Sequence, residues 1–242
     1  MTQREFETWV FDLDNTLYPA TVDLFSQIDM RMKAYISQLL DLPPEEAFRL
    51  QKHYYNTYGT SLRGLMVEHH VDPADFLAHV HDIDHGVLSL DPELDAALSR
   101  IKGRKLIYTN GSAKHAQDVL AAIGLHHHFE AIYDITAADF IPKPQQPSYD
   151  KFLRIHGVDP TAAIFFEDSH KNLLPAHEMG MTTVLVHNEV HWSSLDIDPT
   201  TLGHCHHITD HLGSWLNGWF DGHIPDKGAD RSPSFTPTQT DS

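Results

Sequence analysis

Two acidic residues follow a short apolar run near the start of the chain, and their types and spacing could support catalysis. Asp12 and Asp14 come directly after the apolar residues 9–11. If the chain stays extended, side chains two residues apart lie on the same side, so both carboxylates would converge on one small volume. Such a pair could bind a cation and supply a nucleophile. The alternative is a strand that ends in an Asx turn, because Asp and Asn are common turn formers.

A hydroxyl, an amide and a glycine follow a second apolar run. Thr109, Asn110 and Gly111 lead from a predicted strand into a predicted helix that begins at Ser112. The first turn of a helix offers free backbone N–H groups and the positive end of its dipole, which suits a phosphate. The alternative is a helix that is simply capped by serine.

A lysine and a second acidic pair complete the candidate residues. Lys143 lies between two prolines, which restrict the backbone as a preorganised phosphate contact would require, although most lysines are solvated charges. Glu167 and Asp168 end another apolar run. A second acidic strand end beside the first favours a hard divalent cation, and Mg²⁺ is the natural choice next to a phosphate.

Helices and strands alternate in the part of the chain that carries these residues. Strands are expected at 9–11, 105–110, 131–135, 163–166, 183–187 and 207–208, and helices at 92–100, 112–123, 148–156 and 172–179. This alternation predicts an α/β fold, a doubly wound, mostly parallel Rossmann-like sheet with helices on both faces. The carboxyl ends of parallel strands meet at one edge of such a sheet, where ligands bind.

A stretch with only helical periodicity separates the first strand from the second. Its predicted helices cover 21–40, 43–58, 62–70 and 73–79. We therefore expect an α/β core domain formed by residues 1–18 and 91–221, with an all-helical cap domain inserted at 19–90. Residues 222–242 contain almost nothing apolar and several prolines, which predicts a disordered tail.

The composition limits the kind of partner. The chain has 242 residues, 41% of them hydrophobic, which is enough to bury a core, and its formal net charge is −17. This charge disfavours nucleic acid or an anionic membrane surface as a partner, so a phosphorylated substrate would need local cations. The polar start of the chain, the lack of a long apolar run and the single cysteine, Cys205, predict a cytoplasmic protein. We expect a monomer or a small homo-oligomer.

The four polar clusters, in this order, resemble the four motifs of the haloacid dehalogenase superfamily, whose phosphohydrolases form an aspartyl-phosphate. The resemblance covers about residues 8–215, and the helical insert resembles the small helical cap of that superfamily. Segments 11–19 (Phe-Asp-Leu-Asp-Asn-Thr-Leu-Tyr-Pro) and 58–65 (Tyr-Gly-Thr-Ser-Leu-Arg-Gly-Leu) are similar to the pyrimidine 5′-nucleotidase branch.

The resemblance implies different roles for the two acids of the first motif. Asp12 would be the nucleophile that attacks phosphorus. Asp14 would protonate the leaving oxygen and then activate water, and its backbone carbonyl would bind Mg²⁺. Thr16 would position Asp14, and Lys143 would neutralise both the phosphate and the nucleophile.

The same resemblance implies how the phosphate and the metal are held. Thr109 and the backbone amides of Asn110 and Gly111 would bind the phosphoryl oxygens. Asp168 would complete the metal site, and Glu167 would bind the ion directly or through water. Without a cation, an anionic nucleophile could hardly approach an anionic phosphate, since two unit charges about 4 Å apart repel by about 4 kcal/mol at an effective dielectric near 20.

The expected reaction is hydrolysis of a nucleoside monophosphate, with pyrimidine nucleotides preferred. A sugar-phosphate phosphatase or a phosphomutase of the same superfamily is the alternative, because the mutases share the acid at Asp14 and the acidic pair at 167–168. Dehalogenases typically lack an acid at the position of Asp14, since release of a halide needs no proton. Arg63 is either a substrate contact or a solvated helix charge.

The histidines suggest a different class of function, a transition-metal-binding protein. His126, His127 and His128, and a second stretch at 204–207, supply nitrogen and sulfur donors. Neither has the spacing of a structural zinc site, so we favour an incidental origin. A catalytically silent scaffold is a third possibility, and the intact motifs argue against it.

Overall fold

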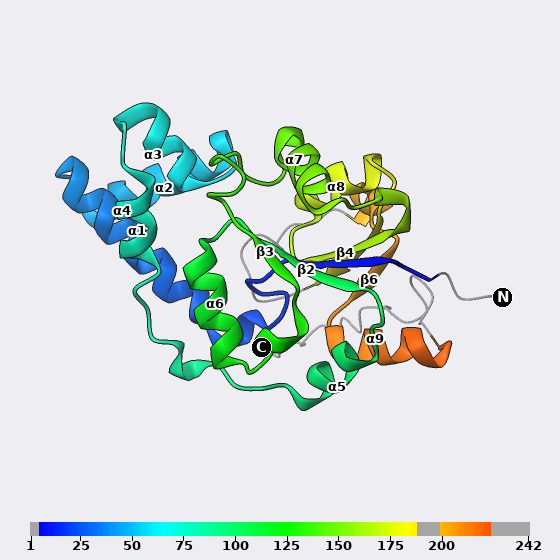
Figure 1. The fold of residues 1–242 in the computed structure, drawn as a ribbon. Coiled ribbons are helices and arrows are strands. Elements are labelled where there is room, and N and C mark those ends of the chain that lie inside the picture. Colours follow the sequence, from blue (N-terminus) through cyan, green and yellow to red (C-terminus); the bar gives the residue numbers. More distant parts are fainter. Residues whose placement is uncertain (1–4, 188–198, 224–242) are drawn as a thin grey trace, which may run out of the picture.

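The computed structural model describes residues 5–187 and 199–223, and its centre is one parallel sheet (Figure 1). The strand order is β3-β2-β1-β4-β5-β6, and every neighbouring pair is parallel. The strands are β1 (Thr8–Phe11), β2 (Arg104–Tyr108), β3 (Ala131–Tyr133), β4 (Ala163–Glu167), β5 (Thr182–Val186) and β6 (His207–Thr209). Because β1 lies in the middle, its carboxyl end is flanked by those of β2 and β4.

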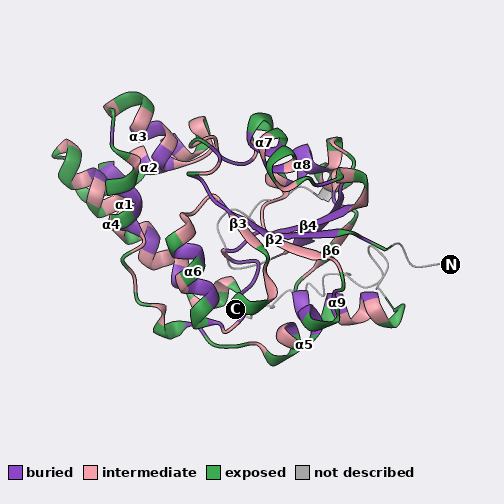
Figure 2. Ribbon diagram, viewed as in Figure 1, coloured by how far each residue is buried: buried purple, intermediate pink, exposed green. Residues whose placement is uncertain are grey.

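Helices cover both faces of this sheet. Helices α5 (Pro92–Arg100), α6 (Ala113–Ala122) and α9 (Leu212–Asp221) pack on one face, and α7 (Gln146–His156) and α8 (His170–Glu178) pack on the other. Side chains of β1 alternate between the two resulting apolar clusters: Trp9 and Phe11 join the first, and Val10 joins the second. Strands β1, β4 and β5 are buried along their whole length between the helices, whereas the edge strands β3 and β6 are less buried (Figure 2). The predicted doubly wound α/β fold is confirmed.

Four further helices pack together beyond the carboxyl ends of the strands. They are α1 (Leu24–Leu40), α2 (Pro44–Tyr58), α3 (Ser61–His69) and α4 (Pro73–Val80). Their ends follow local signals: Asp72 caps α4 by accepting from the Ala74 N–H, and Gly59 ends α2 with φ 88°. These helices have their own apolar cluster, which Ile135 of the α/β part also joins. The division of the chain into two domains stays a prediction.

Short helical turns join these elements, and some bounds differ from the sequence expectation. The turns are η1 (Ala20–Val22), η2 (His85–Val87), η3 (His126–His128), η4 (Pro160–Ala162) and η6 (Pro199–His204). The predicted strand at 105–110 ends at Tyr108, and helix α9 was not predicted. Most of the predicted tail, 224–242, lies outside the described residues. Among the described helices, none is both long and apolar enough to cross a membrane.

A glycine permits the close packing of α2 against α3, which gives a first prediction. A Cβ on Gly64 would lie 2.5 Å from Cβ and Cγ of Tyr54. We expect Gly64→Ala to lower the free energy of unfolding by about 1–3 kcal/mol in urea denaturation, because this clash outweighs the better helix propensity of alanine. Gly203→Ala is the control, since its Cβ would meet nothing within 4 Å. Equal stability of the two variants would contradict the packing argument.

Candidate active site

A cavity of about 170 Å³ lies where the strands end, between the sheet and helices α1–α4. All four polar clusters reach it. Its wall contains the two aspartates after β1, the loop after β2, the lysine between two prolines and the acidic end of β4. The structure thus brings together eight of the predicted residues: Asp12, Asp14, Thr109, Asn110, Gly111, Lys143, Glu167 and Asp168. Strand β1 itself ends at Phe11, so the extended conformation assumed for the two aspartates does not persist to Asp14, which begins a turn.

Lys143 forms the centre of the polar wall. Its side chain is 1% exposed, and Nζ donates to Asp12 Oδ1 at 2.7 Å, to Glu167 Oε2 at 2.6 Å and to the Tyr108 carbonyl at 2.8 Å. Burial works against its charge, but the two carboxylates outweigh that cost and raise the pKa of Lys143 above its usual value. The lysine is therefore a fixed positive charge.

Asp12 is held at both oxygens and by its backbone. Oδ1 accepts from Lys143, Oδ2 accepts from Thr16 Oγ1 at 3.1 Å, and its N–H donates to the Phe166 carbonyl at 2.9 Å. Thr16 thus binds Asp12, whereas the resemblance implies a contact with Asp14. Burial, followed by repulsion from Glu167, raises the pKa of Asp12 to about 7.

Asp14 has partners that the sequence patterns did not identify. Its Oδ1 accepts from the Tyr18 hydroxyl at 2.6 Å and lies 2.8 Å from Nε2 of His115. Although burial favours the neutral acid, the neighbouring His115 outweighs it and lowers the pKa of Asp14 to about 2. The two aspartates therefore occupy opposite electrostatic environments, which is how similar groups acquire different chemical roles.

His115 is fully buried and links Asp14 to the other side of the cavity. It projects from α6, and the ring of His81, at the end of α4, stacks on it with centroids 4.3 Å apart. His81 Nδ1 also lies 3.0 Å from Ser112 Oγ, the cap of α6. Sequence spacing could not reveal these contacts, because His115 is 101 positions from Asp14.

The loop after β2 has fewer free donors than expected for a phosphate cradle. The Gly111 N–H donates to Thr109 Oγ1 at 2.9 Å, so this amide already has a partner inside the chain. The Asn110 side chain holds the segment around Lys143, since its Oδ1 accepts from the Lys143 N–H at 2.8 Å. A Cβ at Gly111 would lie 3.1 Å from His115 Cδ2 and 3.3 Å from Thr109 Oγ1, so a larger residue would have to displace one of these side chains slightly.

Three carboxylates gather beside Lys143 and fit a hard cation. Asp12, Glu167 and Asp168 each place an oxygen within 4.8 Å of the others. Burial, followed by repulsion from Glu167, raises the pKa of Asp168 well above its usual value. One lysine does not balance three acids, and oxygen donors are those that Mg²⁺ prefers. The donor set therefore fits the predicted magnesium ion.

A family model described as haloacid dehalogenase-like hydrolase matches residues 6–180, which is most of the chain. The chain is a haloacid dehalogenase-like hydrolase. Phosphate metabolism protein 8 of Saccharomyces cerevisiae is 28% identical over 197 residues, which cover 74% of this hydrolase and 61% of the yeast protein. Fructose-1-phosphate phosphatase YqaB of Escherichia coli is 35% identical over 79 residues, 31% of the hydrolase and 40% of the bacterial enzyme. The hydrolase thus matches less than two thirds of either relative.

Solved structures share the fold of the hydrolase. The L-2-haloacid dehalogenase of Xanthobacter autotrophicus superposes with a TM-score of 0.56 at 18% identity, covering 89% of the hydrolase and 99% of the dehalogenase. At this identity the likeness shows the fold alone.

The wall that α1–α4 contribute to the cavity of the hydrolase is mainly apolar. Phe25, Ile28, Met32, Leu62, Phe76, Leu77 and Val80 line it, together with Tyr55, Thr60, Ser61 and His81. Burial, and then the charges of Asp168 and Glu167, raise the pKa of Tyr55 to about 12, so its hydroxyl stays protonated. Arg63 is not among the described residues that line the cavity. Its backbone N–H donates to Oγ1 of Thr60, which caps α3.

Two of the three histidines at 204–207 make ordinary hydrogen bonds in the hydrolase. His204 Nε2 lies 2.7 Å from the His170 carbonyl, and His206 Nδ1 lies 2.8 Å from Thr183 Oγ1. Cys205 is buried in the apolar cluster beneath α7 and α8. In the parts of the chain that the structure describes, this stretch forms no group of three convergent ligands.

Proposed function

We propose that this hydrolase is a Mg²⁺-dependent phosphomonoesterase that acts through an aspartyl-phosphate on Asp12. The observation that carries the proposal is the position of Asp14, a half-buried carboxylate in the same cavity as Asp12 and bound by Tyr18 and His115. An alcohol leaving group needs a proton donor, whereas a halide does not. The presence of Asp14 and its contacts with Tyr18 and His115 therefore favour phosphate ester hydrolysis over dehalogenation.

In the proposed reaction, the two aspartates act in turn. An oxygen of Asp12 attacks phosphorus, the bond from phosphorus to the leaving oxygen breaks, and Asp14 transfers a proton to that oxygen. Asp14 then takes a proton from water, whose oxygen attacks phosphorus and breaks the bond to Asp12. The charge of the incoming phosphate raises the pKa of Asp14, which is held low in the free protein.

Other residues of the cavity would hold the reacting groups. Lys143 fixes Asp12 and offsets the charge of the phosphate, while Thr109 and the following loop surround the phosphoryl group. Asp12, Glu167 and Asp168, with the backbone carbonyl of Asp14, would hold Mg²⁺, which when bound supplies positive charge to the phosphoryl oxygens. Helices α1–α4 would act as the cap that excludes water.

For the substrate, we propose a nucleoside monophosphate with a pyrimidine base. The apolar wall with Phe25, Phe76 and Tyr55 suits a flat aromatic base better than a sugar, whose hydroxyls need polar partners. The cavity of about 170 Å³ favours the smaller of the two base types. The name of the Escherichia coli relative, a fructose-1-phosphate phosphatase, supports the alternative of a sugar phosphate.

A substrate panel tests this assignment. Phosphate release is measured with Mg²⁺ from UMP, CMP, AMP, fructose 1-phosphate and glucose 1-phosphate. We expect the highest kcat/KM for UMP or CMP. Equal or faster turnover of a sugar phosphate would overturn the nucleotide assignment, and conversion of glucose 1-phosphate into an isomeric phosphate without phosphate release would show a mutase. Activity that does not change when Mg²⁺ is removed by a chelator would contradict the cofactor.

His115 should affect the rate according to the leaving group, because its contact with Asp14 orients the proposed proton donor. We expect His115→Gln to lower kcat/KM for an alkyl phosphate or a nucleotide by about 10²-fold, within the range of general acid catalysis. The loss should be much smaller for p-nitrophenyl phosphate, whose leaving group needs little protonation. Exposed His53 provides the control variant, His53→Gln. Equal losses on both substrates would mean that His115 has only a structural role.

A further inference from the structure

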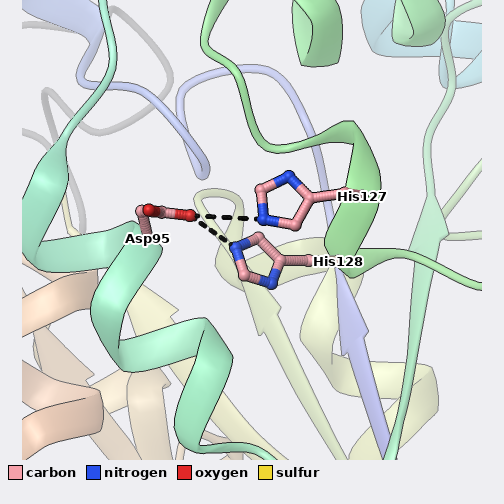
Figure 3. A group of neighbouring side chains, drawn as sticks. All are labelled: Asp95, His127 and His128. Atoms are coloured by element: carbon pink, nitrogen blue, oxygen red, sulfur yellow. Dashed lines mark hydrogen bonds and ion pairs between the residues drawn. The ribbon is translucent and has the colours of Figure 1, made fainter.

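Two neighbouring histidines and a distant aspartate converge outside the cavity. Asp95 lies in the first turn of α5, and His127 and His128 form the end of η3, the turn that precedes β3 (Figure 3). One oxygen of Asp95, Oδ1, is 2.7 Å from Nε2 of His128 and 3.6 Å from Nε2 of His127. One ligand atom from each of the three residues therefore lies within 4.8 Å of the other two.

An ordinary hydrogen bond between two elements would explain the contact of His128 with Asp95, but not the position of His127 beside the same oxygen. His128 is 5% exposed, and its bond to Asp95 joins α5 to the turn. His127 contributes a second imidazole to the same oxygen: its ring lies beside that of His128, with centroids 4.0 Å apart and planes inclined by 39°. Figure 3 shows both Nε2 atoms directed at the one carboxylate.

The three donors match the ligands of a transition metal. Imidazole nitrogen and carboxylate oxygen bind Zn²⁺ at about 2.0–2.2 Å, so two ligands of a tetrahedral ion lie about 3.4 Å apart. The 3.6 Å separation of Asp95 and His127 already fits this value, and the hydrogen bond from His128 must lengthen by less than an ångström. On binding, the ion takes the place of the proton on Nε2, and that proton moves to Nδ1 of the same ring.

Access and surroundings also suit an ion. The side chains of His127 and Asp95 are 55% and 36% exposed, so one side of the group opens to solvent, where water can complete the coordination. None of the three residues lines the cavity of Asp12, where the proposed ligands are all oxygen atoms. The two groups therefore differ in chemistry, since nitrogen donors select Zn²⁺, Co²⁺ or Ni²⁺ over Mg²⁺.

We propose that Asp95, His127 and His128 form a second metal site that binds a transition metal ion such as Zn²⁺ and fastens α5 to the turn before β3. The site departs from the incidental interpretation for two of the three histidines: His126 lies outside the group, and Asp95, 33 positions from His128, completes it. The proposal is independent of the phosphatase reaction.

Metal titration of the full-length, untagged protein tests the site. The protein is stripped with a chelator and titrated with Zn²⁺ by calorimetry in excess Mg²⁺, which occupies carboxylate sites. Co²⁺ serves as a second probe through its visible absorption. We expect one saturable Zn²⁺ site per chain and a higher melting temperature with Zn²⁺. His127→Gln, a substitution at an exposed position, and Asp95→Asn should each weaken binding by about tenfold or more, since even residues outside the ligand shell have effects of that size.

The neighbouring histidine supplies the matched control. His126→Gln changes the same turn but removes no proposed ligand, so it should leave Zn²⁺ affinity and the Co²⁺ spectrum unchanged. All of these variants should keep wild-type phosphate release in Mg²⁺. The proposal is overturned if no saturable binding occurs in excess Mg²⁺. It is also overturned if binding survives unchanged in His127→Gln and Asp95→Asn, which would place the ion at another histidine.

Discussion

Asp12→Asn is expected to lower kcat for phosphate release by at least about four orders of magnitude, because an amide cannot attack phosphorus in place of the carboxylate. Wild-type protein that is quenched in acid during turnover should carry a phosphoryl group on Asp12 by mass spectrometry, and the variant should carry none. The control is Asp221→Asn, a change in a surface ion pair with Arg100 that should keep full activity.

The same substitution should not destabilise the fold. Burial, and then Glu167, raise the pKa of Asp12 to about 7, so the folded protein holds this proton more tightly than the unfolded chain does. Ionisation of Asp12 at higher pH therefore lowers the free energy of unfolding. A neutral Asn removes this cost. In Mg²⁺-free buffer at about pH 8, the variant should therefore unfold at the same temperature as the wild type or higher. Most of the wild-type activity in Asp12→Asn would show that the nucleophile lies elsewhere.

Lys143→Met is expected to combine a loss of activity with a loss of stability. The substitution keeps an unbranched side chain that is one atom shorter, but it removes the only cation in the described wall of the cavity. Without it, Asp12 loses the charge that holds it ionised, and the phosphate loses a counter-charge, so kcat should fall by about 10³-fold. Breaking a buried ion pair should also lower the free energy of unfolding by about 3–5 kcal/mol near neutral pH.

The pH dependence separates this effect from a simple packing defect. Lys143 lowers the pKa of Asp12, so its removal raises that pKa further above 7. A carboxyl group whose pKa is raised in the folded state does not affect the free energy of unfolding below its usual pKa. It lowers the free energy of unfolding as the pH rises from the usual pKa to the raised value. The stability loss of Lys143→Met should therefore be small near pH 4 and large near pH 8 in urea denaturation.

A surface lysine gives the matched control. Lys114 pairs with Asp118 at 2.6 Å, but its side chain is 77% exposed. Lys114→Met should change the free energy of unfolding by less than about 1 kcal/mol at any pH. If Lys143→Met showed an equally small and pH-independent change, Lys143 would not hold buried carboxylates in solution.

Local signals were sufficient for most of the fold. Helix α5 begins after Asp91, which accepts from the N–H of Glu93, and it spans the predicted residues Pro92–Arg100. The strand ends carried apolar runs followed by polar residues, so the cluster around Lys143 could be predicted without coordinates. Helix α9 was not predicted because Gly213 and Gly218 interrupt its helical pattern. A Cβ on Gly213 would lie 3.0 Å from the Leu94 backbone N, so this glycine allows α9 to pack closely against α5.

The contacts of Asp14 could not be predicted, for a physical reason. A motif indicates which residues end a strand, but not which side chains from other elements reach them. His115 lies on α6 and His81 at the end of α4, and only the packing of both helices brings them to Asp14. Thr16 illustrates the same limit at short range, because the turn at Asp14 directs its hydroxyl to Asp12.

The central position of β1 determines how slowly the amide of Asp12 should exchange with solvent. This strand pairs with β2 and β4, and the Asp12 N–H extends the ladder to Phe166. We expect such an amide to exchange only when the whole sheet opens, and amides in α1–α4 to exchange by opening of smaller units. The proposed nucleophile is thus expected to belong to the most persistent part of the molecule, and the apolar wall to a more adaptable part. If the proposed function holds, substitutions in α1–α4 should change which leaving group is accepted without changing the reaction at Asp12.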